Sequence, residues 1–260
     1  MLYLKRNFAV VPLTRIVEKV ADPMAKPLQE IALTFDDGLK NHITIVYPIL
    51  RQLELPATFF VCPGLIETGE WQWPNEVIAR LELLTQSERQ EFSKRNGFSR
   101  TEPMWIVELM KSLTTKERKI VQNSLRIETA SFVLSKEQEI MSQPMTWEDL
   151  RSLDSKLITI GSHTMTHPIL TTVEESEMRF EITESRRILE ERLKRSIDFF
   201  CYPNGSFDGN VVEFVRKSYV AAVTAEYGGV RHGDDLYKMG RISADSPLAT
   251  FAWRLHRLEG

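Results

Sequence analysis

The chain has 260 residues, with 33 Lys and Arg against 36 Asp and Glu, and a formal net charge of -3. This length suffices for one α/β barrel or for two smaller domains. The nearly balanced charge excludes the basic footprint of a nucleic-acid-binding protein, and no apolar run approaches the roughly 18 residues of a membrane-spanning helix.

The N-terminal segment and the cysteines both predict a cytoplasmic protein. An apolar run at residues 8–13 is short, is interrupted by Pro12 and leads to Arg15 rather than to the small-residue cleavage site of a secretory signal. Cys62 and Cys201 each close an apolar run. We expect both to be buried, reduced thiols rather than partners in a disulfide.

Five short apolar runs have the continuous pattern of parallel strands that are covered on both faces. They are residues 31–35, 57–61, 157–160, 197–201 and 220–224. Helical segments separate several of these runs, and alternating strands and helices indicate right-handed βαβ units. The sequence therefore predicts an α/β fold built on a parallel sheet or barrel.

Two of the intervening helices have recognisable starts. Thr172 and Glu175 have the spacing of a capping box, and apolar residues follow them at helical intervals. Asp208 is expected to open a second helix, which leads into the run at 220–224.

The middle of the chain, from about residue 75 to 142, has helical periodicity and little strand character. Thr114 and Glu117 form a further capping box there. No Gly- and Ser-rich linker sets this segment apart. We therefore predict one domain over residues 1–260 with a helical insertion at about 75–142.

Asp36 and Asp37 are the first candidate site residues, because they end an apolar strand and precede Gly38. Ligands of parallel α/β folds gather at the carboxyl ends of the strands. Adjacent carboxylates at a strand end point in different directions, so one can hold a cation while the other faces a substrate. The alternative interpretation is a simple turn that ends the strand.

His163 and His167 are the second candidate, directly after the predicted strand at 157–160. Two histidines four residues apart can bind one metal ion, and the alternative is a pair of ordinary surface or core residues. Imidazoles combined with a carboxylate suit zinc, cobalt, nickel or iron. Two imidazoles and one aspartate would leave positions open for water and substrate, as in a catalytic zinc site.

The third candidate is the turn Tyr202-Pro203-Asn204-Gly205, which follows the run at 197–201. Pro203 and Gly205 fix a tight loop, whose backbone N–H groups could face a developing oxyanion. Such a sequence is by itself more often only a turn. Its place at the same end of the predicted sheet makes Asn204 a catalytic candidate and Tyr202 and Pro203 candidates for substrate binding.

Three motifs in this order resemble those of the polysaccharide deacetylases with a NodB-homology domain, a class of carbohydrate esterases. Residues 34–38 are similar to the first motif, 162–167 to the second and 200–205 to a variant of the third. The resemblance covers about residues 28–243 apart from the insertion. The opening at residues 8–13 resembles members associated with exopolysaccharide biosynthesis.

The resemblance implies a distorted (β/α) barrel of about seven strands and the hydrolysis of an N-acetyl group on an amino sugar. It implies that Asp37, His163 and His167 bind a divalent metal, usually zinc, with cobalt, nickel and manganese as alternatives. Asp36 would be the general base. The backbone N–H of Asn204 would be an oxyanion-hole donor.

Two features depart from the family pattern. The third motif usually begins with an Arg that pairs with the base, and Cys201 stands there. Arg241 could supply this cation from another strand end, or could be an ordinary surface arginine. The family's late Leu-x-His, whose His protonates the leaving amine, is missing, and His232 and His256 have the surroundings of surface residues. The general acid is therefore unassigned.

Three further residues have two interpretations each. His42 could line the site, but a place at the start of a helix is favoured. Trp71 and Trp73 could form a platform on which a sugar stacks, or could be buried under the insertion.

Other functions stay open at this point. The same fold could serve as a carbohydrate-binding pseudoenzyme, as a metal-dependent hydrolase of O-acetyl groups or another metal-dependent barrel enzyme, or as a structural protein that binds a partner through its insertion. The intact aspartate and histidine pairs favour the deacetylase, since binding alone requires no general base. A cytoplasmic deacetylase would meet a nucleotide- or lipid-linked precursor of an exopolysaccharide or surface glycan.

Overall fold

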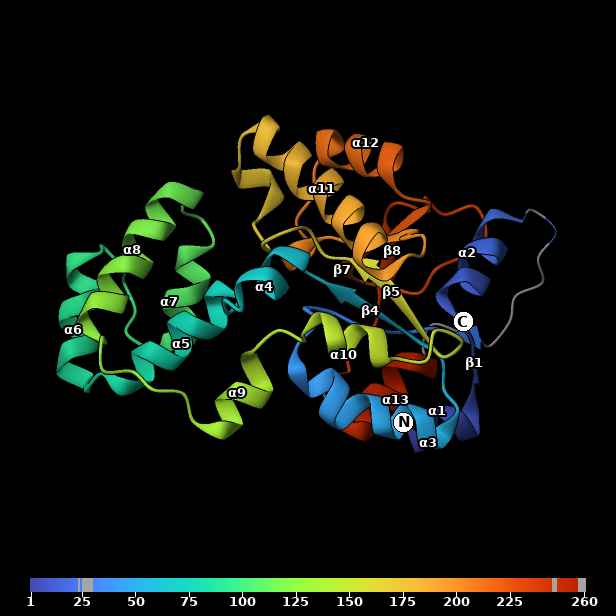
Figure 1. The fold of residues 1–260 in the computed structure, drawn as a ribbon, viewed down its shortest axis with the longest axis horizontal. Helices are drawn as coiled ribbons and strands as arrows, with labels where there is room; N and C mark the ends of the chain where they lie inside the picture. The colour runs from blue at the N-terminus through green and yellow to red at the C-terminus, as the bar shows by residue number, and fades with distance from the viewer. Residues whose placement is uncertain (23, 25–29, 245–246, 257–260) are drawn as a thin grey trace.

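The computed structural model describes residues 1–22, 24, 30–244 and 247–256. Within these ranges, six parallel strands in the order β3-β4-β5-β6-β7-β8 curl into a half-barrel (Figure 1). The strands are β3 (Leu33–Phe35), β4 (Ala57–Val61), β5 (Ile158–Ser162), β6 (Phe199–Cys201), β7 (Ala221–Tyr227) and β8 (Met239–Arg241). The predicted α/β barrel is confirmed, with a sheet of six strands where about seven were expected.

The edges of this sheet differ from the prediction. The expected strand at residues 31–35 is divided, because β2 (Glu30–Ile31) pairs with β1 (Ala9–Val10) in a separate parallel ladder while β3 pairs with β4. The strand β8 was not predicted, since its three residues are too few to show a pattern and include a glycine. It pairs with β7 at Val223 and Tyr227, with an irregularity between them.

Four helices connect consecutive strands of the sheet and form its outer layer. They are α3 (Tyr47–Leu53), α10 (Trp147–Ser152), α11 (Glu175–Leu193) and α12 (Gly209–Ser218). Helix α11 contacts both α10 and α12 (Figure 1). The remaining helices outside the middle segment are α1 (Leu2–Asn7), α2 (Leu13–Ala21), α4 (Pro63–Thr68) and α13 (Leu248–His256), with a π-helical turn at His42–Val46 and 3-10 turns at Leu170–Thr172 and Pro203–Gly205.

The two predicted helix starts have opposite outcomes. Helix α12 begins as expected, because the Asp208 carboxylate accepts a hydrogen bond from the backbone N–H of Val211 at 2.9 Å. The capping box at Thr172 is wrong. Thr172 ends a 3-10 turn, and its hydroxyl donates to the carbonyl of Ile169 at 2.9 Å, so α11 begins after it without a side-chain cap.

The central strands β4, β5 and β6 are buried on both faces, as the continuous apolar runs predicted, whereas β3 and β8 at the edges are mostly half-buried. Phe59 and Phe200 belong to the core between the sheet and the outer helices. Their neighbours Phe60 and Phe199 belong to a second cluster on the inner face, to which α2 contributes Leu13 and Val17. The sheet is therefore a rigid frame, and the loops at its carboxyl end are held in place.

The middle segment between β4 and β5 is helical, as predicted. It contains α5 (Trp73–Leu83), α6 (Gln86–Arg95), α7 (Pro103–Met110), α8 (Thr115–Glu128) and α9 (Lys136–Ser142). The capping box of Thr114 and Glu117 is confirmed at the start of α8. The segment packs around its own hydrophobic cluster. Its assignment as an insertion in one domain stays a prediction, and residues 28 and 29 of the predicted core lie outside the described ranges.

A close contact inside the sheet gives a test of this packing. A methyl group on Gly161 of β5 would overlap the ring of Phe60 and lie 3.0 Å from the carbonyl oxygen of Phe199. We expect Gly161→Ala to lower the free energy of unfolding by about 1–3 kcal/mol in urea denaturation.

The matched control is Gly209→Ala at the start of α12, where the added methyl has no neighbour within 4 Å. This change should be neutral or stabilise the protein by up to about 1 kcal/mol. Equal stabilities of the two variants would contradict the described packing of β5.

Candidate active site

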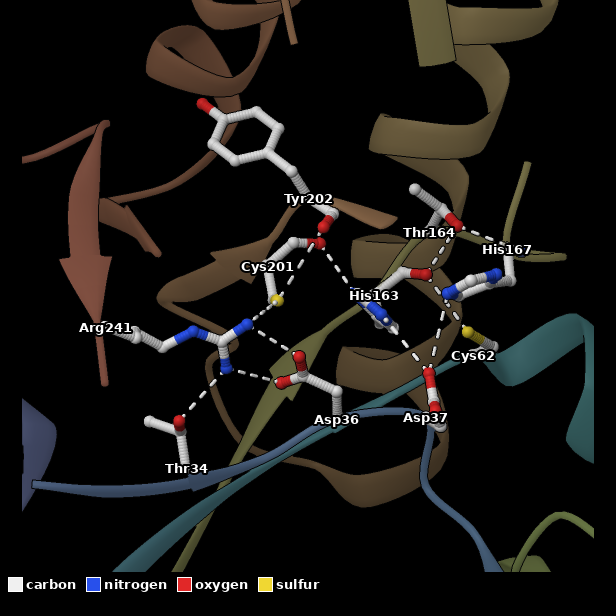
Figure 2. A network of polar contacts seen from close by, with 10 residues as sticks. All are labelled: Thr34, Asp36, Asp37, Cys62, His163, Thr164, His167, Cys201, Tyr202 and Arg241. Atoms are coloured by element: carbon white, nitrogen blue, oxygen red, sulfur yellow. Dashed lines mark hydrogen bonds and ion pairs between the residues drawn. The ribbon is translucent and has the colours of Figure 1, made fainter. Parts of the chain in front are cut away.

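The predicted site residues come from four different strand ends and meet at one rim of the sheet (Figure 2). Asp36 and Asp37 follow β3, and His163 follows β5. Cys201 ends β6 and Arg241 ends β8. Parallel strands end on the same side, so the fold itself brings together residues that are far apart in the sequence.

Asp37, His163 and His167 form a compact group of three potential ligands. Asp37 Oδ1 lies 3.4 Å from Nε2 of His163 and 3.5 Å from Nε2 of His167. These distances exceed the usual N–H···O hydrogen bond of about 2.7–3.2 Å. They match the spacing of about 3.3–3.4 Å between ligands that lie about 2.0–2.1 Å from one tetrahedral zinc. The group is therefore a candidate site for a divalent cation.

Hydrogen bonds fix the ring of His163 and the backbone of His167. Nδ1 of His163 donates a hydrogen bond to the carbonyl of Cys201 at 2.7 Å, which turns Nε2 toward Asp37. The Thr164 hydroxyl donates to the carbonyl of His163 and accepts the backbone N–H of His167 at 3.1 Å. Thr164 and His167 both have positive φ, 67° and 60°. This unusual turn places the two rings 4.8 Å apart between their centres.

Charge in the group favours a bound cation. Burial would raise the pKa of Asp37, but the two histidines outweigh it and hold this pKa well below its ordinary value. Burial and the adjacent His163 lower the pKa of His167 to about 4, so its ring is neutral near pH 7. Burial would lower the pKa of His163, but the carboxylates of Asp37 and Asp36 raise it. A carboxylate between two imidazoles thus attracts positive charge, which a metal ion would supply.

Asp36 faces a different partner from its neighbour Asp37. Both oxygens of its carboxylate accept hydrogen bonds from the guanidinium of Arg241, at 2.7 and 2.6 Å. Burial would raise the pKa of Asp36, but the hydrogen bonds and charge of Arg241, together with the charge of His163, lower it. The Asp36 carboxylate is therefore ionised and fixed in orientation.

Arg241 is itself held by several groups (Figure 2). Its Nε donates to the carbonyl of Thr224 at 2.7 Å, and one terminal nitrogen donates to the hydroxyl of Thr34 at 3.0 Å. The other lies 3.3 Å from the sulfur of Cys201. The cation expected beside Asp36 thus lies against Cys201, the residue that stands in the place of the usual arginine. Cys201 and Cys62 are free and buried, as predicted.

The third motif is divided between the site and the core. The ring of Tyr202 points away from Asp36 and Asp37 (Figure 2). Tyr202 is 1% exposed, and its hydroxyl donates to the carbonyl of Tyr237 at 2.9 Å. Pro203 is buried as well. Asn204 is exposed at the turn and has a φ of 56°. The side chain of Tyr202 could contact a substrate only if the core opened. Tyr202 can therefore contact a substrate in this fold only through its backbone.

The other histidines and tryptophans that the sequence singled out lie in varied surroundings. His42 is buried, and burial lowers its pKa to about 4. Trp73 is buried beneath the guanidinium of Arg118, 4.7 Å from the ring centre, which favours the packing interpretation. Trp71 packs edge-on against Phe132. His232 and His256 are exposed, as expected.

Two polar residues beside the histidines and Asp37 were missed in the sequence. Gln72 is 5% exposed, and its amide contributes to the low pKa of Asp37. Glu181 is 3% exposed and contacts the turn between the histidines. Glu181 lies at helical spacing from the buried Met178, so a carboxylate on the apolar face of α11 was the available signal. No local signal marks Gln72.

Comparison with known protein families identifies one that matches the chain. The sequence pattern described as "Polysaccharide deacetylase" matches residues 24–91 and 112–223, which is more than half of the chain. No curated protein sequence matches the chain.

Several solved structures have a similar fold. The Streptococcus pyogenes deacetylase PplD, in complex with acetate, is 15% identical with a TM-score of 0.59, over 92% of this chain and 75% of that one. IcaB from Ammonifex degensii is 17% identical with a TM-score of 0.61, over 98% of this chain and 86% of that one. A de-N-acetylase from Aggregatibacter actinomycetemcomitans is 14% identical with a TM-score of 0.61, over 97% of this chain and 85% of that one.

The geometry predicts how metal binding responds to substitution. Asp37→Ala removes the oxygen that both Nε2 atoms face, so we expect the affinity for Zn²⁺ or Co²⁺ to fall by at least about 100-fold. Competition with a chelator measures this change.

Asp36→Asn is the matched control, because it alters the adjacent carboxylate, which contacts Arg241 and not the histidines. Its metal affinity should stay close to that of the wild type. Asp37→Ala protein that binds metal as tightly as the wild type would exclude Asp37 as a ligand.

Proposed function

The chain belongs to the polysaccharide deacetylase family, and we propose that it is a metal-dependent hydrolase that removes an N-acetyl group from an amino sugar in a saccharide or glycan precursor. The observation that carries this proposal is the pairing of two different carboxylates at one rim. Asp37 faces two imidazoles within 3.5 Å, and Asp36 is ionised beside them and held by Arg241. A metal ligand and a base are thus adjacent in the chain but have separate partners.

A divalent cation held by Asp37, His163 and His167 would polarise the acetyl carbonyl and lower the pKa of a water molecule. Asp36 accepts the proton of the attacking water in this proposal. Each of its oxygens accepts one hydrogen bond from Arg241, and a carboxylate oxygen has capacity for another. The backbone N–H of Asn204 donates to the developing oxyanion.

The leaving amine requires a proton, and Asp36 is the group that has just accepted one. We propose that Asp36 returns this proton and so acts first as base and then as acid. His256 bonds to Tyr3 at 2.8 Å, and His232 lies in an exposed turn that lines the same cavity as Asp36 and Asp37. His42, whose pKa burial lowers to about 4, is neutral near pH 7 and so is not an imidazolium acid there.

Two of the similar structures support the proposed substrate class. The Streptococcus pyogenes structure contains acetate, which is the acid that deacetylation releases. The Aggregatibacter protein is described as a de-N-acetylase, which favours an amide over an ester. We propose a cytoplasmic enzyme with zinc as its metal, acting on a nucleotide- or lipid-linked precursor of an exopolysaccharide or surface glycan. No described helix is long and apolar enough to cross a bilayer.

Asp36→Asn tests the proposed base. The amide cannot accept a proton at neutral pH, so we expect kcat for acetate release from N-acetylated oligosaccharides to fall by about 10²–10⁴-fold. The metal content should stay unchanged, since Asp36 contacts Arg241 rather than the histidines. Full activity in metal-loaded Asp36→Asn protein would refute the assignment of the base.

Arg241→Ala tests the partner of the base. Without the guanidinium the pKa of Asp36 rises, so the acidic limb of kcat/KM, where the base becomes protonated, should move to higher pH. We expect a loss of about 10–100-fold at neutral pH. Arg241→Lys keeps the charge but not the paired hydrogen bonds, so its rate should lie between the rates of the wild type and of Arg241→Ala. An unchanged rate and pH profile in Arg241→Ala would show that Arg241 has no part in the reaction.

A further inference from the structure

Glu181, on the buried side of α11, contacts the turn that connects the two histidines. Its Oε2 accepts hydrogen bonds from the backbone N–H groups of Met165 at 2.7 Å and Thr166 at 2.9 Å. Its Oε1 accepts the hydroxyl of Thr166 at 2.6 Å. One carboxylate therefore satisfies three donors that lie between His163 and His167.

This turn has a shape that its sequence alone does not favour. Thr164 is β-branched and has a φ of 67°, and His167 has a φ of 60°. Left-handed backbone conformations of such residues cost free energy and persist only where surrounding contacts hold them. The hydrogen bonds that the backbone N–H groups of Met165 and Thr166 donate to Glu181 are contacts of this kind, because these residues lie between the two left-handed ones.

The turn is also held from its other side. The backbone N–H of Gly64, in α4, donates to the carbonyl of Met165 at 2.9 Å. The peptide units at the centre of the turn are therefore fixed between α4 and α11. Helix α4 thus binds the carbonyl of Met165, whereas Glu181 accepts the hydrogen bonds of the N–H groups of Met165 and Thr166.

The burial of Glu181 is costly for the fold itself. The carboxylate is 3% exposed and forms no ion pair among the described residues. A buried carboxylate without a cation stabilises a fold less than an apolar side chain of similar size. What this carboxylate supplies instead is a set of charge-assisted hydrogen bonds that specify the shape of one turn.

We propose that Glu181 is a positioning residue of the metal centre, which fixes residues 164–166 so that His163 and His167 present their Nε2 atoms to one cation. The inference rests on the proposed function only in requiring that Asp37 and these histidines bind a metal. Ligand-orienting contacts of this kind typically change metal affinity by about 10–100-fold when they are removed.

Glu181→Gln is the direct test, because it keeps the size of the side chain but replaces one acceptor oxygen by an NH₂ group that cannot accept. We expect the dissociation constant for Co²⁺, measured by chelator competition, to rise by about 10–100-fold. The visible absorption of bound Co²⁺ should also change, since it reports the geometry of the ligands. Ile182→Val is the control for general destabilisation, because Ile182 is next to Glu181 on α11 and is fully buried. The hydrogen bonds described for Ile182 join its carbonyl to Ser185 and Tyr219 and not to the turn.

A second pair of variants avoids any folding defect of Glu181→Gln. Thr166→Val removes one of the three donors to Glu181, and Thr166→Ser retains it. We expect Thr166→Val to weaken Co²⁺ binding by about 3–10-fold, less than the 10–100-fold for loss of a whole contact because two of the three donors remain, and Thr166→Ser to bind like the wild type.

The outcomes separate this inference from the proposed function. A wild type that binds Co²⁺ while Glu181→Gln and Thr166→Val bind it equally well would overturn the role of Glu181 and leave the metal centre in place. An equal loss of affinity in Ile182→Val would also overturn it, since general destabilisation would then explain the effect. A wild type that binds no divalent cation would contradict the metal centre and the role of Glu181 together.

Discussion

Two carboxylates that are adjacent in the chain must stay ionised at the same rim of the sheet, and the rest of the site depends on how their repulsion is relieved. Each charge raises the cost of the other, and the charge of Asp37 indeed acts to raise the pKa of Asp36. The fold relieves this repulsion by giving each carboxylate a different partner. Arg241 reaches Asp36 from β8, while the two histidines reach Asp37 from the end of β5. In the proposed function, this separation of partners lets Asp37 bind a metal while Asp36 acts as a base.

Sequence reasoning succeeded where the signal was local. Apolar runs predicted the buried strands, and the motifs at 34–38 and 162–167 identified side chains that lie together in the structure. It was less successful where partners are distant in the chain. Asp36 and Arg241 are 205 positions apart, and only the arrangement of parallel strand ends brings them together. Arg241 could be suggested because the resemblance to the family implies an arginine beside the base and Cys201 stands in its place, but the strand β8 that carries Arg241 is too short to predict.

Cys201 stands where the resembled motif usually has an arginine, and Arg241 supplies the positive charge from a different strand. A cysteine is short and its thiol here is buried and neutral, since burial raises its pKa. The guanidinium of Arg241 lies beside this thiol, 3.3 Å from the sulfur. The Asp36 carboxylate thus has a bidentate partner although β6 does not supply one. The proposed chemistry requires a positive charge beside Asp36, and this charge can come from a strand other than β6.

The buried polar groups of the site also link metal binding to stability. His163, His167 and Glu181 are each less than a tenth exposed, and burial of polar side chains opposes folding unless their hydrogen bonds are satisfied. Backbone and hydroxyl groups satisfy Glu181 and Nδ1 of His163, whereas Nδ1 of His167 is buried without a hydrogen-bond partner among the described residues and the two Nε2 atoms face Asp37 at distances longer than a good hydrogen bond. A cation that binds only this folded arrangement would contribute its binding free energy to stability. The buried residues that make the site suitable for a metal would therefore be stabilised when a metal binds.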